Sequence, residues 1–286
     1  MSLLSDAVAG WSPGPVTGAA TVLPGPAAAL AALLDGPAPP LADGDPLPPG
    51  WHLFASPEWP ATADLGEDGH PRAGHFLPPL PHRRRMIAGG RLAVTAPLRV
   101  GATVERTSSL ARCEVKAGRG GEMLLVTVRS EYREGGALLV TDEQDVVYRS
   151  QEAGSSPAPA GAGVPAVEGG PAVEVLPDEA LLFRFSALTY NAHRIHYDLP
   201  YATGVEGHPG LVVHGPLLAL LLLEVVRRHA PDRSVTSSAH RLVRPAYAGA
   251  PVRAAGRSDG DRVELTAGTV GAPASATGTV VLGPAA

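Results

Sequence analysis

The stretch PLLALLLLEVVRRH, residues 216–229, decides the expected fold. Its leading proline suits the first turn of a helix, and Arg227 and Arg228 suit the carboxyl-terminal end, where cations oppose the helix dipole. The first two turns are apolar on every side, which is typical of a buried helix. The sequence therefore predicts one long helix packed against a curled antiparallel sheet, an α+β architecture. A shorter helix is expected at residues 26–34.

The composition excludes several classes of protein. The 286 residues include 34 glycines and 30 prolines but only 5% aromatic residues, which favours many turns and argues against a helical bundle. A net charge of −5 gives no general basic surface for nucleic acid. The most apolar run, residues 217–223, is too short to cross a bilayer, and residues 1–10 lack the pattern of a secretory signal. We therefore expect a cytoplasmic protein without membrane contact. The single cysteine, Cys113, excludes an intrachain disulfide.

A segment rich in Pro, Ala and Gly divides the chain. Residues 151–171 read QEAGSSPAPAGAGVPAVEGGP, which is the composition of a linker. We therefore expect one unit at 1–150 and a second at 172–286. Each unit ends in four stretches rich in Val, Leu and Thr that are separated by turns containing glycine, a pattern that predicts strands joined as hairpins.

A short internal match suggests that the two units are copies of one fold. Residues 97–104 read PLRVGATV and residues 245–252 read PAYAGAPV, so both follow the pattern P-x-x-x-G-A-x-V. Both copies precede an expected strand, and they lie 148 residues apart. We infer a duplication from this match.

Polar, titratable residues gather just before the long helix. They lie in YNAHRIHYD, residues 190–198, and in GHPGLVVHGP, residues 207–216. Histidine exchanges protons near neutral pH, and the free N–H groups at a helix start favour negative charge. A base and a donor for an oxyanion are therefore expected together, which predicts acid–base chemistry on a polarised carbonyl.

The same stretch resembles the signature of the MaoC-like family of hydratases and dehydratases, which have hotdog folds. The resemblance places the catalytic histidine at His196 and the acid that follows it at Asp198. It places the helix-start glycine, whose N–H binds the thioester carbonyl in that family, at Gly215. Asn191 stands where the family has its catalytic aspartate, and His193-Arg194 stands where it has an Asn-Pro pair, so this chain departs from the signature at both places.

One branch of that family is more similar still. YNAHRIHYD with GLVVHGPL resembles mesaconyl-C4-CoA hydratases and 3-hydroxyacyl-thioester dehydratases, and the words WHLF, GHFLPP, RRM and AGGR in the first half resemble that branch too. The resemblance implies a double hotdog, with two tandem units that are each a curled antiparallel sheet around a helix. It implies one active site in the C-terminal unit and a degenerate, non-catalytic N-terminal unit. A shift of 148 residues places His196 opposite Pro48.

The resemblance also implies a mechanism. Hydration of an enoyl thioester adds water to Cβ and a proton to Cα, and negative charge develops on the thioester oxygen. We expect His196 to act as general base and acid, and the Gly215 amide to bind the oxyanion. Asn191 does not titrate, so it orients the water or only caps a turn. His196 acting alone on both carbons predicts syn addition.

Other residues of the motif are candidates for substrate binding. Coenzyme A carries phosphates, which Arg side chains bind well, and the expected binders of phosphate and acyl group are Arg83, Arg84, Arg85, Tyr190, His193, Arg194, Asp198 and His214. Arg241 and Arg244 are rivals for the phosphates. The histidines show no compact ligand pattern such as H-E-x-x-H, so neither a metal nor another cofactor is expected.

Four functions remain open from the sequence. The first is a hydro-lyase that hydrates an α,β-unsaturated acyl-CoA, with mesaconyl-C4-CoA favoured by the branch. The second is a dehydratase of 3-hydroxyacyl thioesters carried on CoA or on a carrier protein. The third is an inactive acyl-thioester binding protein, suggested by Asn191, and the fourth is a thioesterase, since the hotdog fold also hosts hydrolases. The expected assembly is either a monomer or a homodimer.

Overall fold

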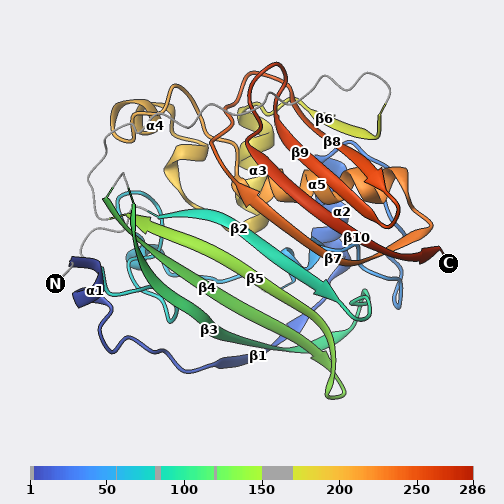
Figure 1. The fold of residues 1–286 in the computed structure, drawn as a ribbon, viewed down its shortest axis with the longest axis horizontal. Coiled ribbons are helices and arrows are strands. Elements are labelled where there is room, and N and C mark those ends of the chain that lie inside the picture. Colours follow the sequence, from blue (N-terminus) through green and yellow to red (C-terminus); the bar gives the residue numbers. More distant parts are fainter. Residues whose placement is uncertain (1–2, 56, 81–84, 119–120, 150–169, 286) are drawn as a thin grey trace.

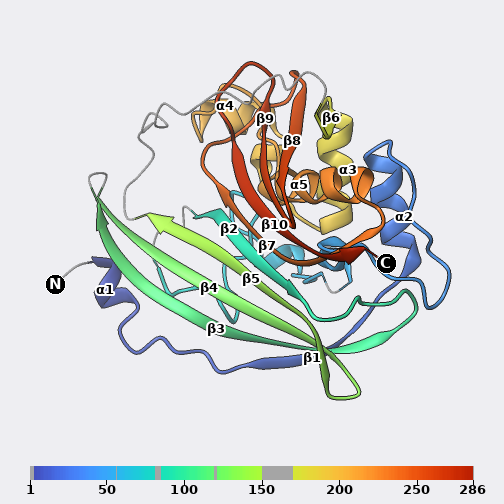
Figure 2. The same cartoon turned by 45° about the vertical axis from the view of Figure 1, so that its right-hand side comes forward.

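The computed structural model describes residues 3–55, 57–80, 85–118, 121–149 and 170–285 (Figure 1, Figure 2). The described part of the chain folds into helices on one side of a large antiparallel sheet. In chain order the elements are α1 (Leu3–Ala7), β1 (Val16–Thr21), α2 (Pro24–Leu33), η1 (Trp51–Phe54), η2 (Thr62–Asp64), β2 (Arg85–Val94), β3 (Thr103–Gly118), β4 (Gly121–Glu134), β5 (Ala137–Arg149), β6 (Ala172–Val175), α3 (Glu179–Thr189), η3 (Arg194–His196), α4 (Leu199–Gly204), α5 (Gly215–His229), β7 (Arg233–Leu242), β8 (Val252–Asp259), β9 (Arg262–Thr269) and β10 (Ala276–Ala285).

The order of the ten described strands shows the expected repeat. It is β1-β3-β4-β5-β2-β7-β10-β9-β8-β6, so the strands before and after the 151–171 segment form the two ends of one sheet. Counted outward from the β2–β7 pair, both halves have the same arrangement, because β5, β4, β3 and β1 on one side match β10, β9, β8 and β6 on the other. The predicted α+β class is confirmed. Residues 151–169 of the expected linker lie outside the described part of the chain.

The offset of 148 residues between the two copies holds along the strands, but it is larger in the chain that precedes them. Arg99 bridges Pro46, and Tyr247, its equivalent in the second copy, bridges Val212. Pro46 and Val212 are therefore equivalent, and Pro48 corresponds to His214. The expected opposition of Pro48 and His196 is wrong, because the second half carries extra chain before this bridge. That extra chain includes η3 and α4.

The expected long helix is confirmed as α5, which begins at Gly215 and ends at His229. It contacts β8, β9 and β10, and its apolar side chains from Leu217 to Val226 are mostly buried. The expected shorter helix is α2, and Figure 2 shows α2, α3 and α5 on the same side of the sheet. The main apolar core joins side chains of both halves.

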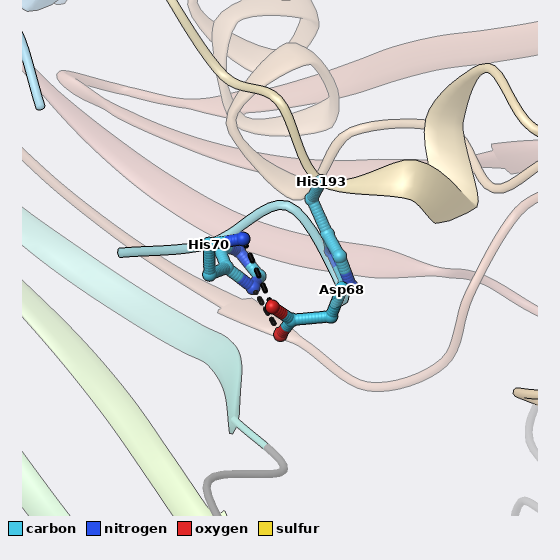
Figure 3. Close-up of side chains that lie close together, drawn as sticks. All are labelled: Asp68, His70 and His193. Atoms are coloured by element: carbon cyan, nitrogen blue, oxygen red, sulfur yellow. Dashed lines mark hydrogen bonds and ion pairs between the residues drawn. The ribbon is translucent and has the colours of Figure 1, made fainter. Parts of the chain in front are cut away.

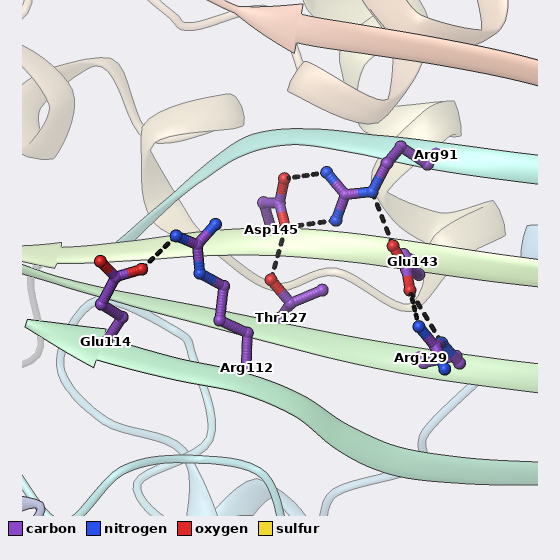
Figure 4. Close-up of polar contacts among 7 residues, drawn as sticks. All are labelled: Arg91, Arg112, Glu114, Thr127, Arg129, Glu143 and Asp145. Carbon is purple, nitrogen blue, oxygen red and sulfur yellow. Dashed lines mark hydrogen bonds and ion pairs between the residues drawn. The ribbon is translucent and has the colours of Figure 1, made fainter.

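The first-half strands carry a charged network on one of their faces (Figure 4). Arg91 donates to Glu143 and to both carboxylate oxygens of Asp145, at 2.6–2.9 Å. Arg129 donates to Glu143, and the Thr127 hydroxyl donates to Asp145. This face of the sheet is polar and partly exposed. The helices and the catalytic candidates lie on the opposite, apolar side of the sheet. Among the described residues, the structure has no helix that is both long and apolar enough to span a membrane.

Candidate active site

A short extended segment, residues 211–213, fixes the candidate site. The Val212 N–H donates to the Ile195 carbonyl at 2.9 Å, and the Val213 N–H donates to the Ala246 carbonyl at 2.9 Å. The segment therefore lies between η3 on one side and the turn before β8 on the other. It leads directly into His214, the N-cap residue of α5. Three parts of the second half therefore meet at residues 211–213: η3, the turn before β8 and the start of α5.

His196 has the geometry of a buried base. Its side chain is 6% exposed, and its Nδ1 lies 2.7 Å from the Val212 carbonyl oxygen. A carbonyl only accepts, so Nδ1 carries the hydrogen and Nε2 keeps a free lone pair. Burial lowers the pKa of His196 to about 4, an effect that the hydrogen bond to Val212 only partly opposes and that the charges of His70 and His208 reinforce. The imidazole is therefore neutral at neutral pH and able to accept a proton.

His214 lies against His196. The two rings are stacked, with centroids 3.6 Å apart and planes 18° apart. The Nε2 atom of His214 shares a hydrogen bond of 2.8 Å with the Ser186 hydroxyl, whereas its buried Nδ1 atom has no hydrogen-bond partner among the described residues. Burial, together with the charges of His196 and His193, holds the pKa of His214 well below its usual value. A neutral ring therefore supports His196 from one side.

The first residue of α5 is placed to donate a backbone N–H beside these rings. Gly215 follows His214 directly, and the first amides of a helix have no acceptor inside it. Pro216, the next residue, has no N–H. A side chain at Gly215 would place its Cβ 2.5 Å from Cδ1 of Leu242 on β7, so the Leu242 side chain fills the space beside this glycine. The neutral imidazole of His196 thus stacks on the residue that directly precedes this amide.

Asn191 closes a turn at the end of α3. Its Oδ1 atom accepts the His193 N–H at 2.9 Å, and its own N–H donates to the Ser186 carbonyl at 2.9 Å. The preceding residue, Tyr190, has a φ of 53° and packs against Trp59, with ring centroids 4.6 Å apart. Of the two roles expected for Asn191, turn capping is observed. The side-chain amide nitrogen is the group left for orienting a water.

Arg194 and Asp198 bind each other. The Arg194 Nε and Nη2 atoms lie 3.0 and 2.7 Å from Oδ2 of Asp198, and Oδ1 of Asp198 accepts the Tyr201 N–H at the start of α4. The guanidinium also lies 4.1 Å from the centre of the Tyr201 ring and donates to the Glu67 carbonyl. Both charges are therefore used to shape the loop between η3 and α4.

The expected arginine cluster is described in part. Arg83 and Arg84 lie outside the described residues. Arg85 begins β2, and its charge contributes to lowering the pKa of His193.

Two residues of the site were not predicted from the sequence. Asp68 and His70 lie in the first half, on a loop after η2 that reaches the second half at His193 (Figure 3). The Nδ1 atom of His70 lies 3.0 Å from Oδ2 of Asp68, and the His70 N–H donates to Oδ1 at 2.9 Å. The only local signal in the sequence was an aspartate and a histidine on either side of Gly69. This pattern is common in turns and does not by itself indicate a functional site.

The loop is docked closely onto the second half. The Arg194 N–H donates to the Asp68 carbonyl at 2.9 Å. Gly69 has a φ of +86°, and a Cβ there would lie 1.8 Å from the Ala192 carbonyl oxygen. Only glycine allows this approach without a shift of backbone. Asp68 and His70 are thus held in place by main-chain contacts.

The imidazoles form a row. The His70 and His193 ring centroids are 3.9 Å apart, and the His193 and His196 centroids are 5.4 Å apart. Burial lowers the pKa of His193 to about 2, reinforced by the charges of His70 and His196. Burial raises the pKa of Asp68, but its hydrogen bonds from His70 outweigh this effect and hold the pKa at about 2. At neutral pH the row therefore holds an ionised carboxylate and an uncharged His193.

The same three side chains are the described group best placed for a metal ion. One ligand atom from each of Asp68, His70 and His193 lies within 4.8 Å of the others. Carboxylate and imidazole donors suit zinc. Oδ2 of Asp68 already shares a hydrogen bond with the His70 Nδ1 atom, and Oδ1 accepts the His70 backbone N–H. The Nε2 atom of His70 and the second lone pair of each carboxylate oxygen are the positions left for a metal.

One antiparallel sheet in two similar halves, with a long central helix packed against it, is the architecture of a double-hotdog protein. Comparison with known proteins agrees. The model of the family described as hydroxyacyl-thioester dehydratase type 2, Htd2, matches residues 50–248, and the chain belongs to this family. The chain is 44% identical to the mesaconyl-C(4)-CoA hydratase of Chloroflexus aurantiacus over 244 residues, which cover 85% of this chain and 86% of that protein.

Solved structures show the same fold. A MaoC-like dehydratase from Phytophthora capsici superposes with a TM-score of 0.69 at 15% identity, covering 95% of both chains. A Mycobacterium tuberculosis protein described as a double hotdog fold superposes with a TM-score of 0.52 at 15% identity, covering 95% of this chain and 96% of that one. The predicted resemblance and the double-hotdog fold are confirmed. The chain is a hydro-lyase of the Htd2 family.

Proposed function

We propose that this enzyme adds water to mesaconyl-C4-CoA or a similar short, branched enoyl-CoA. The observation that carries the proposal is the 44% identity to a mesaconyl-C(4)-CoA hydratase across most of both chains. CoA is preferred to a carrier protein as the thioester carrier because that relative is named for a CoA ester. A CoA ester as substrate also fits the expected cytoplasmic location.

His196 is the proposed general base. Its Nε2 lone pair is free because Nδ1 donates to the Val212 carbonyl, and its low pKa keeps it neutral in the cell. It takes a proton from water as the water oxygen bonds to Cβ. A positioned base of this kind contributes about 10²–10⁴ in rate. The stacked ring of His214 limits rotation of His196, so that Nε2 keeps one direction.

The Gly215 amide is the proposed oxyanion donor. Negative charge moves to the thioester oxygen as Cβ is attacked, and a preorganised N–H there is worth about 10²–10³ in rate. The segment that orients His196 through Val212 runs straight into Gly215, so one stretch of backbone holds both groups. Asn191 is proposed to orient the water through its side-chain amide.

The remaining candidates have different proposed roles. His214 supports the base, and Arg194 with Asp198 shapes the loop rather than binding a substrate carboxylate. Tyr190 and His193 remain candidates for contact with the acyl group, and Arg85, with Arg83 and Arg84, for contact with the CoA phosphates. The family name favours one second candidate function, dehydration of a 3-hydroxyacyl thioester, which is the same chemistry in reverse.

A panel of esters tests the proposal. Initial rates would be measured by mass spectrometry for enoyl-CoA and 3-hydroxyacyl-CoA esters that include mesaconyl-C4-CoA, with wild type and His196→Ala. We expect gain of one water to be fastest on mesaconyl-C4-CoA and to collapse in the variant. Faster loss of water from a 3-hydroxyacyl ester would favour the second candidate. Binding of every ester without any exchange of water would contradict both and leave an inactive binding protein.

A further inference from the structure

We propose that Asp68, His70 and His193 bind a divalent transition-metal ion, best matched by Zn²⁺, that holds a loop of the first half against the second half. Asp68 and His70 lie on the loop after η2, and His193 lies in the turn after α3 (Figure 3). Two of the three ligands are more than 100 positions from the third, which is why the sequence shows no compact ligand pattern. This site is independent of the proposed hydration.

The three side chains are a donor set that suits a transition metal. They offer one carboxylate oxygen and two imidazole nitrogens, and one ligand atom from each residue lies within 4.8 Å of the other two. Imidazole binds zinc well, whereas Mg²⁺ and Ca²⁺ prefer oxygen donors. Three protein ligands of this kind leave the fourth position of a tetrahedral zinc site to water.

Both histidines have nitrogens that the hydrogen bonds of the described residues leave open. The backbone N–H of His193 binds Asn191, but neither of its ring nitrogens has a hydrogen-bond partner in the described part of the chain, although the side chain is half-buried. His70 uses Nδ1 alone, so its Nε2 atom is open among the same residues. Polar groups shielded from water are normally paired, so open nitrogens at this position favour a bound ligand.

Asp68 and His70 already have the spacing of two zinc ligands. Oδ2 of Asp68 lies 3.0 Å from Nδ1 of His70. Bonds of about 2.0–2.1 Å to zinc place two ligand atoms of a tetrahedral site about 3.3 Å apart. The open Nε2 atom is on the far side of the ring from this carboxylate. A cation shared by both residues therefore takes the place of the hydrogen on Nδ1, and the ring stays neutral because its hydrogen moves to Nε2.

The third ligand needs only a small movement. The ring of His193 packs on that of His70, with centroids 3.9 Å apart and planes 34° apart. Because its ligand nitrogen lies within 4.8 Å of the ligand atoms of both partners, it has to approach them by no more than about 1.5 Å. A rotation that separates the two rings brings this nitrogen toward the cation.

The backbone prearranges the two segments that carry the ligands. The Arg194 N–H donates to the Asp68 carbonyl at 2.9 Å, and the Arg194 side chain donates to the Glu67 carbonyl at 3.1 Å. The Gly66 N–H donates to the His70 carbonyl at 2.7 Å, which closes the loop on itself. Because these contacts hold the loop beside His193, binding an ion orders little additional chain.

The expected consequence is a more stable fold. Asp68 and His70 belong to the first half and His193 to the second, so an ion bound by all three joins the halves. An ion that binds the folded chain and not the unfolded chain raises the stability by mass action. The proposed ion stabilises the fold and takes no part in the proposed hydration.

The test uses the tag-free full chain, stripped of metal with a chelator and then dialysed. Zn²⁺ alone is titrated by calorimetry, with Mg²⁺ as the comparison ion, and thermal unfolding is measured with and without Zn²⁺. We expect one Zn²⁺ per chain with a Kd below about 10 µM. We also expect no binding of Mg²⁺, and a Tm raised by about 3 °C or more at about 100 µM Zn²⁺.

Variants locate the ion. Asp68→Asn, His70→Ala and His193→Ala each change one ligand, and the control His75→Gln changes a first-half histidine that bonds to the Gly14 carbonyl instead. All variants are first checked for native folding by circular dichroism. Each ligand variant should bind Zn²⁺ at least about tenfold more weakly and lose the rise in Tm, whereas His75→Gln should match wild type. Asp68→Asn keeps the size of the side chain, so it remains informative if an alanine variant does not fold.

Three outcomes would overturn the proposed metal site. The first is a wild type that binds no Zn²⁺. The second is binding that all three ligand variants retain, which would place the ion at other histidines. The third is binding without a change in Tm, which would exclude a role in holding the halves together. None of these measurements uses enzyme activity, so a wild type that hydrates no ester would overturn the proposed function alone.

Discussion

The two ends of α5 hold buried polar groups of opposite kinds. Near the carboxyl-terminal end, Glu224 is 1% exposed and both of its oxygens are paired. Arg227 donates to each oxygen at 2.7 Å, Arg228 donates at 3.0 Å and the Trp51 indole donates at 3.2 Å. At the other end, buried His214 leaves Nδ1 without a hydrogen-bond partner among the described residues, and His196 leaves a free lone pair.

The contrast between the two ends of α5 distinguishes groups that stabilise the fold from groups that can act on a substrate. A buried carboxylate that meets three donors from the two halves holds those halves together, and its atoms have no capacity left for a ligand. Buried imidazoles whose ring nitrogens lack hydrogen-bond partners contribute less to the stability of the fold, but those nitrogens remain able to exchange protons. Substitutions at the two ends should therefore fail in different ways: one end should lose stability and the other should lose rate.

The largest expected effect is on rate. His196→Ala should lower kcat by about 10²–10⁴-fold, because it removes the proposed base. Its folded structure should persist, since the ring is buried but makes one hydrogen bond. Steady-state kinetics on the best ester and thermal unfolding would check both points. A variant with kcat within about threefold of wild type would assign the base elsewhere.

At the other end the expected effect is on stability. Glu224→Ala leaves Arg227 and Arg228 without their buried partner, so the free energy of unfolding should fall by about 3–5 kcal/mol. Urea unfolding measures this change. The matched control is Glu264→Gln, an exposed ion pair with Arg262 that should change stability by less than about 1 kcal/mol. Similar losses in the two variants would contradict the assigned role of Glu224.

The pH dependence of stability should report the histidine end. Burial lowers the pKa of His196 to about 4 and that of His193 to about 2, whereas both titrate near 6.5 in the unfolded chain. The unfolded state thus binds protons that the folded state does not. The stability is present above about pH 6.5 and is lost as the pH falls toward 4, by up to about 1.4 kcal/mol per pH unit for each such histidine.

Urea midpoints at pH 7, 6 and 5 would measure that slope. His196→Gln removes one of the titrating groups, so its slope should be shallower than that of wild type. An equal slope in the two proteins would show that His196 does not titrate differently in the folded and unfolded states.

The smallest expected effect concerns the start of α5. Gly215→Ala brings a Cβ to 2.5 Å from Cδ1 of Leu242, so either this side-chain end or the Gly215 amide shifts, and kcat should fall by at most about tenfold. The double variant Gly215→Ala/Leu242→Ala makes room for the methyl group and should recover part of the rate. Steady-state kinetics of both variants would test this, and an unchanged kcat in Gly215→Ala would argue against a finely placed oxyanion donor.

The sequence predicted the helices and strands that short-range patterns of apolar and polar residues specify. The apolar run gave α5 to within one residue at its start, and the two sets of strand patterns gave the two halves of the sheet. His196, His214 and Gly215 meet because they lie in one motif around the helix start. Asp68 and His70 were missed because their position depends on main-chain contacts with residues more than 100 positions away, such as the bond from Arg194 to Asp68. No periodic or spacing signal records such a contact.

The central claim, that this fold hydrates an enoyl thioester at the histidine end of α5, is tested most directly with oxygen-18 water. Mesaconyl-C4-CoA would be incubated with wild type and with His196→Ala, and the products analysed by mass spectrometry. The account predicts one labelled oxygen at Cβ of an intact thioester with wild type, and almost none with the variant. Label in a free carboxylate together with released CoA, or equal label from both proteins, would contradict it.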